Sequence, residues 1–243
     1  MTFAQFIYTG PSWAHSSFDP PNTVDHSHPT NLAREWQIPC VNLSQPSTSV
    51  LNRVEAVAKS DIKLPIVWIY NEPLNNLKDV TGMDFVEFIQ RSDWLDIWKE
   101  CNRWCLNKIN NINLPVLLIG GHSDIVDCNF SNITIGYDSW QKYIAKLAGF
   151  KVDNNKVYVT MDNGADYAFD QCWGAEVVHK MIYKHNNIKP SQEITNAVWD
   201  IFFFWKALEK ADLFFEVHPN KRSNQHFAKF LLPTVNKFLQ ETQ

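Results

Sequence analysis

The sequence is poor in glycine and contains no glycine-rich phosphate loop. Only eight of its 243 residues are glycine, and they match neither the Gly-x-Gly-x-x-Gly pattern nor the Walker pattern. This disfavours a doubly wound nucleotide-binding protein. Long apolar runs are also absent, because stretches such as 114–119 and 201–205 are too short to cross a bilayer. No basic segment precedes a long apolar one near Met1, so we expect no signal peptide.

The chain also lacks an excess of charge of either sign. Lys and Arg number 22 against 26 Asp and Glu, which gives a net charge of -4, and no dense basic run occurs. We therefore expect no nucleic-acid partner and no membrane partner. The five cysteines are scattered and offer no metal-ligand spacing, although Cys101 and Cys105 lie one helical turn apart. His26 and His28 are interpreted as solvated. We expect reduced thiols, a cytoplasmic protein, and neither a metal nor a cofactor. Nothing in the composition predicts an oligomeric state.

The apolar residues that are present alternate between two periodicities. Short apolar runs predict strands at Phe3–Tyr8, Ile38–Leu43, Leu64–Tyr70, Leu114–Ile119 and Val157–Met161. Helical spacing predicts helices over 50–58, 83–110, 138–150, 166–185 and 191–210. The first of these helices would start from an N-cap at Thr48 or Ser49. This alternation predicts an α/β fold, a three-layer α/β/α sandwich with a mostly parallel central sheet.

No linker or internal repeat divides the chain, so we expect a single domain over 1–243. The region around 124–190 is predicted to be a helical insertion or lid, and it could equally form a partner surface. In a parallel sheet, ligands bind at the carboxyl ends of the strands. The polar turns that follow the predicted strands are therefore expected to gather at one edge.

The stretch 214–220 near the C-terminus has the composition of a catalytic segment. It reads as a strand end, then a loop in which Pro219 follows His218, then a helix with one apolar face. A histidine held between a strand and a helix can serve as a general base. The alternative is a capping or surface histidine.

Ser12 is the candidate nucleophile for that base. It follows the first predicted strand, behind Gly10, where its hydroxyl would be exposed to His218. Glu216 is the carboxylate nearest to His218 and would orient the imidazole, and Asp212 is the second choice. Backbone N–H groups near Ser12 and Ser47, with the side chain of Asn71, would supply an oxyanion hole.

The order of these residues resembles the SGNH (GDSL-like) hydrolases. Gly10-Pro11-Ser12 is similar to the family block that holds the nucleophile, and the segment 41–47 is similar to the second block, with Ser47 in place of a glycine. The tail from His218 through Pro233 is similar to the last block and its helix. The resemblance covers nearly the whole chain. It implies a flavodoxin-like α/β/α fold and the activity of an esterase, a lipase or a carbohydrate acyl-esterase.

The chain departs from this family at several positions. Pro11 replaces the aspartate of the first block, and Phe215 stands where the family has the aspartate that orients the histidine. The Gly-x-Asn-Asp block has no clean match. Its place after the third strand points to Asn71, whereas the appearance of Gly120-Gly121-His122 favours His122. Trp13 and His122 are candidates to line the pocket.

These residues lead to two expectations. The first is a serine esterase that acts on an acyl ester of a small molecule or carbohydrate, through Ser12 and His218. The second is a catalytically silent protein of the same fold that binds a ligand or partner.

Overall fold

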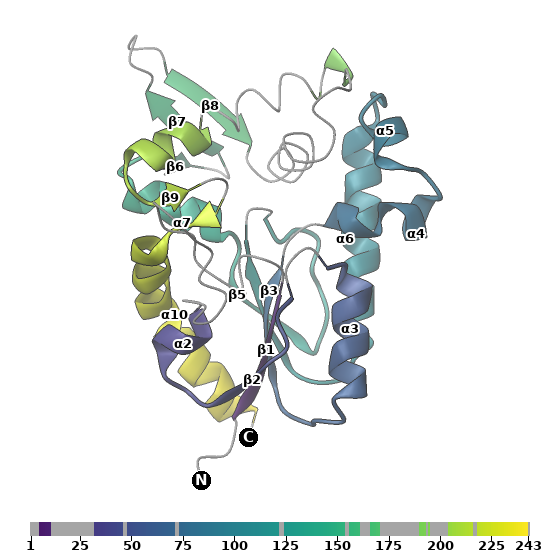
Figure 1. The fold of residues 1–243 in the computed structure, drawn as a ribbon, viewed down its shortest axis with the longest axis vertical. Helices are drawn as coiled ribbons and strands as arrows, with labels where there is room; N and C mark the ends of the chain where they lie inside the picture. Colours follow the sequence, from purple (N-terminus) through teal and green to yellow (C-terminus); the bar gives the residue numbers. More distant parts are fainter. Residues whose placement is uncertain are drawn as a thin grey trace.

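The centre of the molecule is a five-stranded sheet covered by helices on both faces (Figure 1). The computed structural model describes residues 5–10, 32–45, 48–70, 73–121, 124–153, 156–160, 166–170, 190–192, 194, 204–215 and 218–242. The strands of the central sheet are β1 (Phe6–Thr9), β2 (Cys40–Asn42), β3 (Ile66–Tyr70), β4 (Val116–Gly120) and β5 (Ile133–Tyr137). Their order is β2-β1-β3-β4-β5, and every pairing is parallel. The predicted three-layer α/β/α sandwich is confirmed, with the 2-1-3-4-5 order of doubly wound sheets.

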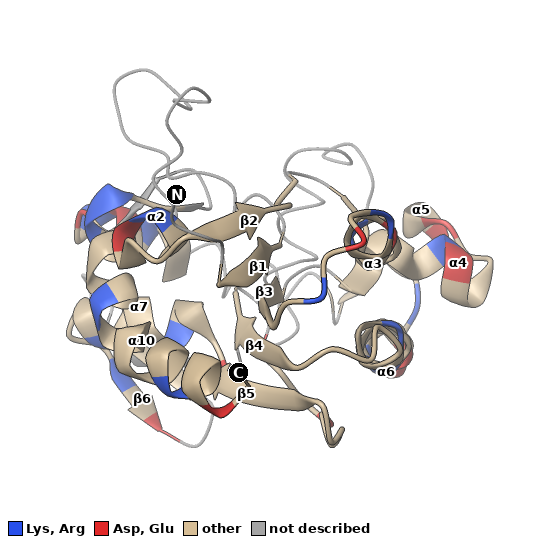
Figure 2. Cartoon of the chain, turned by 90° about the horizontal axis from the view of Figure 1, so that it is seen from below, with Lys and Arg blue, Asp and Glu red and all other residues tan. Residues whose placement is uncertain are grey.

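Two layers of helices flank this sheet. Helices α2 (Leu32–Trp36), α7 (Trp140–Leu147) and α10 (Lys221–Glu241) cover one face, and α3 (Val50–Lys59) and α6 (Trp94–Asn110) cover the other (Figure 1). Between β3 and α6 the chain forms a 3-10 turn (Pro73–Asn76) and the short helices α4 (Leu77–Thr81) and α5 (Phe85–Phe88). Figure 2 shows that charged residues lie on the helices and loops, while the strands of the central sheet carry none.

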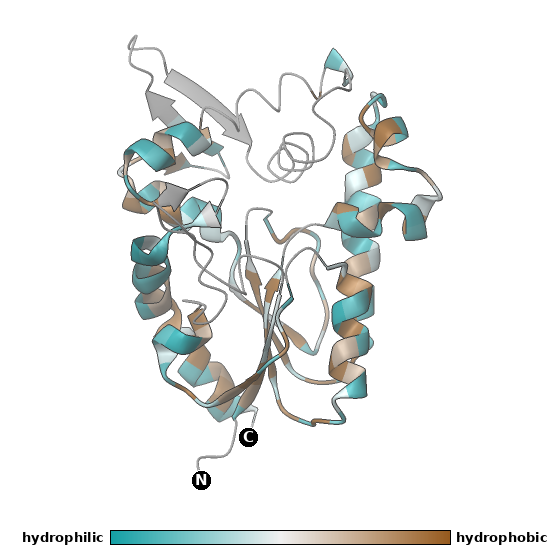
Figure 3. Cartoon of the chain, in the orientation of Figure 1, coloured by the Kyte–Doolittle hydropathy of each residue, from teal (hydrophilic) through white to brown (hydrophobic). Residues whose placement is uncertain are grey.

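The continuous apolar runs of the inner strands follow from burial on both faces. In β3, Val67 and Ile69 belong to the cluster under α7 and α10, whereas Trp68 belongs to the cluster under α3 and α6. Successive side chains of a strand point to opposite faces, so a strand covered on both sides needs apolar residues at every position. Figure 3 shows the resulting hydrophobic centre between the two helical layers.

Side-chain caps fix where α3, α7 and α10 begin. The hydroxyl of Ser49 accepts a hydrogen bond from the backbone N–H of Asn52, at 3.2 Å, and starts α3, which confirms one of the two predicted caps. Ser139 caps α7 and Asn220 caps α10 in the same way. The predicted helix over 83–110 is divided into α5, which starts at a capping box formed by Asp84, and α6, which starts at Trp94.

The region 124–190 differs from the predicted helical insertion. It contributes β5 to the central sheet, then α7, and then an antiparallel sheet of β6 (Lys151–Asp153), β7 (Lys156–Thr160) and β8 (Asp166–Asp170). The predicted strand near Val157 is confirmed, and Val157 joins the cluster of α7 and α10. The helix predicted from residue 166 is wrong over β8, where pairing with β7 determines the structure; 171–185 lies outside the described residues.

Residues 204–242 end in α10, which packs against the central sheet. Residues 204–210 are helical, within the predicted 191–210, and a two-stranded antiparallel ladder of β9 (Phe214–Phe215) and β10 (His218–Pro219) leads into α10. No helix in the described ranges is long and apolar enough to span a membrane.

Candidate functional site

The carboxyl ends of the parallel strands form the edge at which a ligand is expected. Two backbone hydrogen bonds continue beyond the strands at this edge. The N–H of Gln45 donates to the carbonyl of Gly10, at 3.0 Å, and the N–H of Gly121 donates to the carbonyl of Tyr70, at 2.9 Å. The segments that leave β1 and β2 are therefore joined to each other, as are those that leave β3 and β4.

Most of the predicted site residues lie outside the described part of the chain. They are Ser12, Trp13, Ser47, Asn71, His122 and Glu216. The residues that precede four of them in the sequence lie at the carboxyl ends of the strands. Gly10 precedes Ser12 by two residues, Gln45 precedes Ser47 by two, and Tyr70 and Gly121 directly precede Asn71 and His122. The four segments that would carry Ser12, Ser47, Asn71 and His122 therefore start close together at this edge. The side chains of these four residues lie outside the described part of the chain.

His218 lies in a short strand and not in a loop, which corrects the sequence-based expectation. Its backbone pairs with Phe215 in the β9–β10 ladder, and the N–H of Asn220 donates to the carbonyl of Leu213, at 3.2 Å, behind it. Asn220 then caps α10 by accepting from Ser223. A ladder of two residues on each strand, closed by a helix cap, explains why the local sequence has the appearance of a loop.

The first turns of α10 lie at the same edge of the sheet as the carboxyl ends of the strands. The ring of Phe227 stacks on Trp140, with centroids 4.8 Å apart, and Trp140 is the first residue of α7, just beyond β5. The hydroxyl of Tyr143 donates to the carbonyl of His226, at 3.2 Å. At the other end of α10, Phe238 borders the turn that precedes β4. The helix therefore runs antiparallel to the strands, with residue 218 on the side of the candidate site.

Asp212, the second choice for an orienting carboxylate, has an exposed side chain next to Arg222. Its side chain is 80% exposed and lies 3.7 Å from the guanidinium of Arg222. The side-chain amide of Asn220 donates to the carbonyl of Asp212, so the residue contributes its backbone to the start of α10. Glu216 keeps its place as the preferred candidate on sequence grounds.

A buried ion cluster, which sequence reasoning missed, lies where β4 and β5 end. The ammonium group of Lys142 is 2.6 Å from Asp124 and 2.7 Å from Asp138. The side chains of Lys142 and Asp124 are only 5% and 2% exposed, whereas that of Asp138 is 44% exposed. Burial alone lowers the pKa of Lys142, but its attraction to the two carboxylates more than compensates and leaves this pKa above 10.5. The available sequence signal was the spacing of four residues between Asp138, which precedes the N-cap of α7, and Lys142 in its first turn.

Hydrogen bonds beside this cluster fix both ends of the segment that contains His122. The carbonyl of Gly121 accepts from the N–H of Gln141, at 3.1 Å, and from the hydroxyl of Ser139, at 3.4 Å. The N–H of Ile125 donates to the carbonyl of Asp138, at 3.0 Å. The chain before and after residues 122–123 is therefore tied to the turn between β5 and α7.

A second buried cation fixes the end of the segment that contains Ser47. The guanidinium of Arg53 donates to the carbonyl of Thr48, at 2.8 Å, and lies 5.9 Å from the ring centroid of Trp68. Arg53 is fully buried on α3. Because a buried guanidinium must be hydrogen-bonded and charge-compensated, this contact holds the chain at residue 48 against the sheet.

Hydrogen bonds behind β3 hold the turn that follows Asn71. The side-chain amide of Asn76 donates to the sulfur of Cys105, at 3.3 Å, and its oxygen accepts from the N–H of Leu51, at 3.4 Å. The hydroxyl of Tyr70 donates to the side-chain oxygen of Asn102, at 2.6 Å. The thiol of Cys105 is thus part of a structural network. Within the described ranges, no group of three or more His, Cys, Asp or Glu residues is arranged to hold a metal ion.

Comparisons of the chain with protein-family models, with curated proteins and with solved structures found no match.

Proposed function

We propose that the protein is a serine hydrolase that cleaves an acyl ester of a small molecule or carbohydrate. Ser12 is the nucleophile and His218 the base. The observation that carries the proposal is the position of β1 between β2 and β3. The segment with Ser12 leaves β1, so the segments with Ser47 and Asn71 start from the strands on either side of it.

That arrangement suits acyl transfer, in which donors must surround the oxygen of the attacked carbonyl. Neighbouring strands lie about 4.8 Å apart, so the segments on both sides of β1 are within reach of a group bound to Ser12. β4 is two strands away from β1, at about 10 Å. Strand order therefore favours Asn71 over His122 as an oxyanion donor. In this proposal, His122 and Trp13 form part of the pocket wall.

In the proposed reaction the Ser12 oxygen attacks the acyl carbonyl while His218 accepts the hydroxyl proton. The tetrahedral oxyanion collapses, the ester C–O bond breaks, and His218 returns the proton to the leaving alcohol. Water then attacks the acyl-enzyme with the same base, which releases the carboxylic acid and regenerates Ser12. Glu216 would orient the imidazole.

A catalytically silent, ligand-binding protein is the second candidate, and one observation favours it. Phe215, which occupies the position of the family aspartate, is the ladder partner of His218. If Glu216 does not reach the imidazole, the base has no orienting carboxylate. The pocket would then bind an ester or a related ligand without cleaving it.

Hydrolysis of p-nitrophenyl acetate and butyrate by purified protein tests the proposal. Ser12→Ala and His218→Ala should each lower kcat/KM about a thousandfold or more, and Asn71→Ala about a hundredfold. Ser60→Ala, at the C-terminal end of α3, is the matched control and should keep full activity. Equal activity of wild type and Ser12→Ala would contradict the esterase proposal and favour the ligand-binding alternative.

A further inference from the structure

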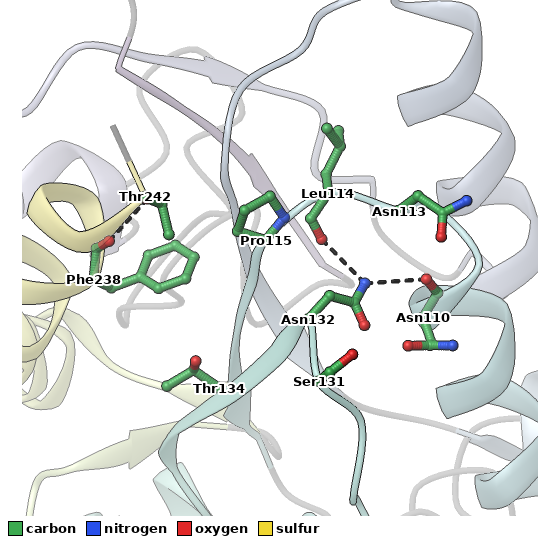
Figure 4. Close-up of a pocket in the computed structure, with 9 residues that line it drawn as sticks. All are labelled: Asn110, Asn113, Leu114, Pro115, Ser131, Asn132, Thr134, Phe238 and Thr242. Atoms are coloured by element: carbon green, nitrogen blue, oxygen red, sulfur yellow. Dashed lines mark hydrogen bonds between the residues drawn. The ribbon is translucent and has the colours of Figure 1, made fainter.

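A recess lies at the amino ends of the strands, opposite the candidate active site. It is open to solvent, measures about 570 Å³, and lies where β4 and β5 begin, beside the C-terminal end of α10 (Figure 4). Pro115 directly precedes β4 and Asn132 directly precedes β5, so the recess is separated from the candidate active site by the length of the strands. Its volume is within the range of small-molecule sites.

Among the residues that the structure describes, no charged side chain lines this recess. Its wall carries amide and hydroxyl groups, and its apolar part consists of Leu114, Pro115 and Phe238. The polar residues are Asn110, Asn113, Ser131, Asn132, Thr134 and Thr242. Amides and hydroxyls both donate and accept hydrogen bonds, which fits a neutral ligand with many hydroxyl groups.

Two helices end at the recess and add to its acceptor character. α6 ends at Asn110, and α10 ends at Glu241 with Thr242 as its C-cap. The C-terminal end of a helix carries partial negative charge, although the carbonyl of Asn110 already accepts from the N–H of Asn113 and the amide of Asn132. The described part of the wall contains no lysine or arginine, so this partial negative charge disfavours anions such as phosphate and favours ligands that donate hydrogen bonds.

One side chain holds the wall in shape before any ligand arrives. The amide nitrogen of Asn132 donates to the carbonyls of Asn110 and Leu114, at 3.0 and 3.2 Å, and so joins the end of α6 to the start of β5 (Figure 4). These two bonds fix the orientation of the amide. No residue in the described ranges donates to the buried Asn132 Oδ1, which leaves one more acceptor beside the recess.

We propose that this recess is a binding site for a neutral saccharide or similar polyol, independent of the candidate esterase site. Ligand hydroxyls would donate to the side-chain oxygens of Asn113 and Ser131 and accept from the Asn110 amide and the Thr134 hydroxyl. The apolar surface of Pro115 and Phe238 would contact the C–H face of a sugar ring. Direct hydrogen bonds with neutral partners predict weak, millimolar affinity.

Backbone amide NMR of the full chain tests this proposal, with glucose, N-acetylglucosamine, maltotriose and xylotriose as probes. At least one saccharide should give saturable shifts at residues 110–115 and 131–134 below about 50 mM. Inorganic phosphate should give none there. Asn110→Ala keeps the carbonyl that Asn132 uses, and Thr134→Val suits a strand. Each should raise the Kd about tenfold.

Asn107→Ala, on the exposed face of α6, is the matched control and should leave the Kd unchanged. Ser12→Ala should bind the saccharide as well as wild type does, so failure of the esterase proposal would not affect this result. The site would be rejected if none of the probes gave saturable shifts, if the shifts lay only at the carboxyl edge, or if Asn107→Ala weakened binding as much as the two recess variants.

Discussion

Phe215 and His218 are partners across the antiparallel ladder of β9 and β10. Side chains at directly opposed positions of such a ladder share one face of the sheet. An aspartate at position 215, where the resemblance to the SGNH hydrolases implies one, is therefore expected on the face that carries residue 218. From this pairing we predict that a carboxylate at position 215, where the chain has phenylalanine, would lie near residue 218.

Phe215→Asp is accordingly expected to strengthen the proposed base. An aspartate beside the imidazole holds the productive tautomer and stabilises the imidazolium, so p-nitrophenyl acetate hydrolysis should increase about tenfold or more. Phe214→Asp is the matched control, because position 214 pairs with Pro219 and should give no gain. A folded Phe215→Asp protein, verified by its thermal unfolding, with unchanged activity would contradict this account of the ladder.

Removing the Lys142 ammonium should destabilise the protein, because it takes the paired cation away from the buried carboxylate of Asp124. We expect Lys142→Met to lower the free energy of unfolding by about 3–5 kcal/mol in urea titrations. Lys146→Met, on an exposed position of the same helix, should change it by less than about 0.5 kcal/mol. The double variant Lys142→Met/Asp124→Leu should recover most of the loss. A single variant as stable as the control would contradict the role of this ion pair.

The same ion pair predicts a dependence of stability on pH. The pKa of Lys142 is raised in the folded state above 10.5, its ordinary value. The contribution of the ammonium is therefore complete below pH 10.5 and is lost as the pH rises through the raised pKa. Above about pH 10.5, wild type should therefore lose more unfolding free energy than Lys142→Met. Parallel loss in both proteins would assign the alkaline transition to other groups.

Cys40 should react slowly with thiol reagents in the folded protein. Burial raises the pKa of its thiol from 9.0 to about 11, so the reactive thiolate is about a hundredfold scarcer near neutral pH. Iodoacetamide labelling at pH 8, read by peptide mass spectrometry, should modify Cys40 about a hundredfold more slowly in native than in urea-unfolded protein. Cys40→Ser identifies the peptide. Equal rates in the two states would contradict this pKa.

The sheet could be predicted from sequence where a strand is buried on both faces. β3 and β4 have apolar residues at every position, and such runs are distinctive within a short window. β5 was missed because, unlike the inner strands, it has no continuous buried apolar run. Its Thr134 and Ile135 are exposed and Gly136 interrupts it, so its structure comes from pairing with β4. β8 was predicted as helix for a similar reason. Its five residues show no clear strand pattern in the sequence, and its structure depends on pairing with β7.

The candidate site was predictable only in part. Strand order determines which loops are neighbours, and the alternation of strands and helices gave the fold class from which that edge could be inferred. The Lys142–Asp124 pair could not be predicted, because it joins residues on different elements whose proximity depends on the pairing of β4 with β5. His218 was expected in a loop because a two-residue strand has no periodicity to detect.

The most direct test of the central claim is labelling with a serine-directed fluorophosphonate, followed by intact mass measurement. The account predicts one adduct on wild type, none on Ser12→Ala, and a much slower reaction of His218→Ala. It would be contradicted if wild type formed no adduct under conditions that label a control hydrolase, or if Ser12→Ala were labelled as fast as wild type.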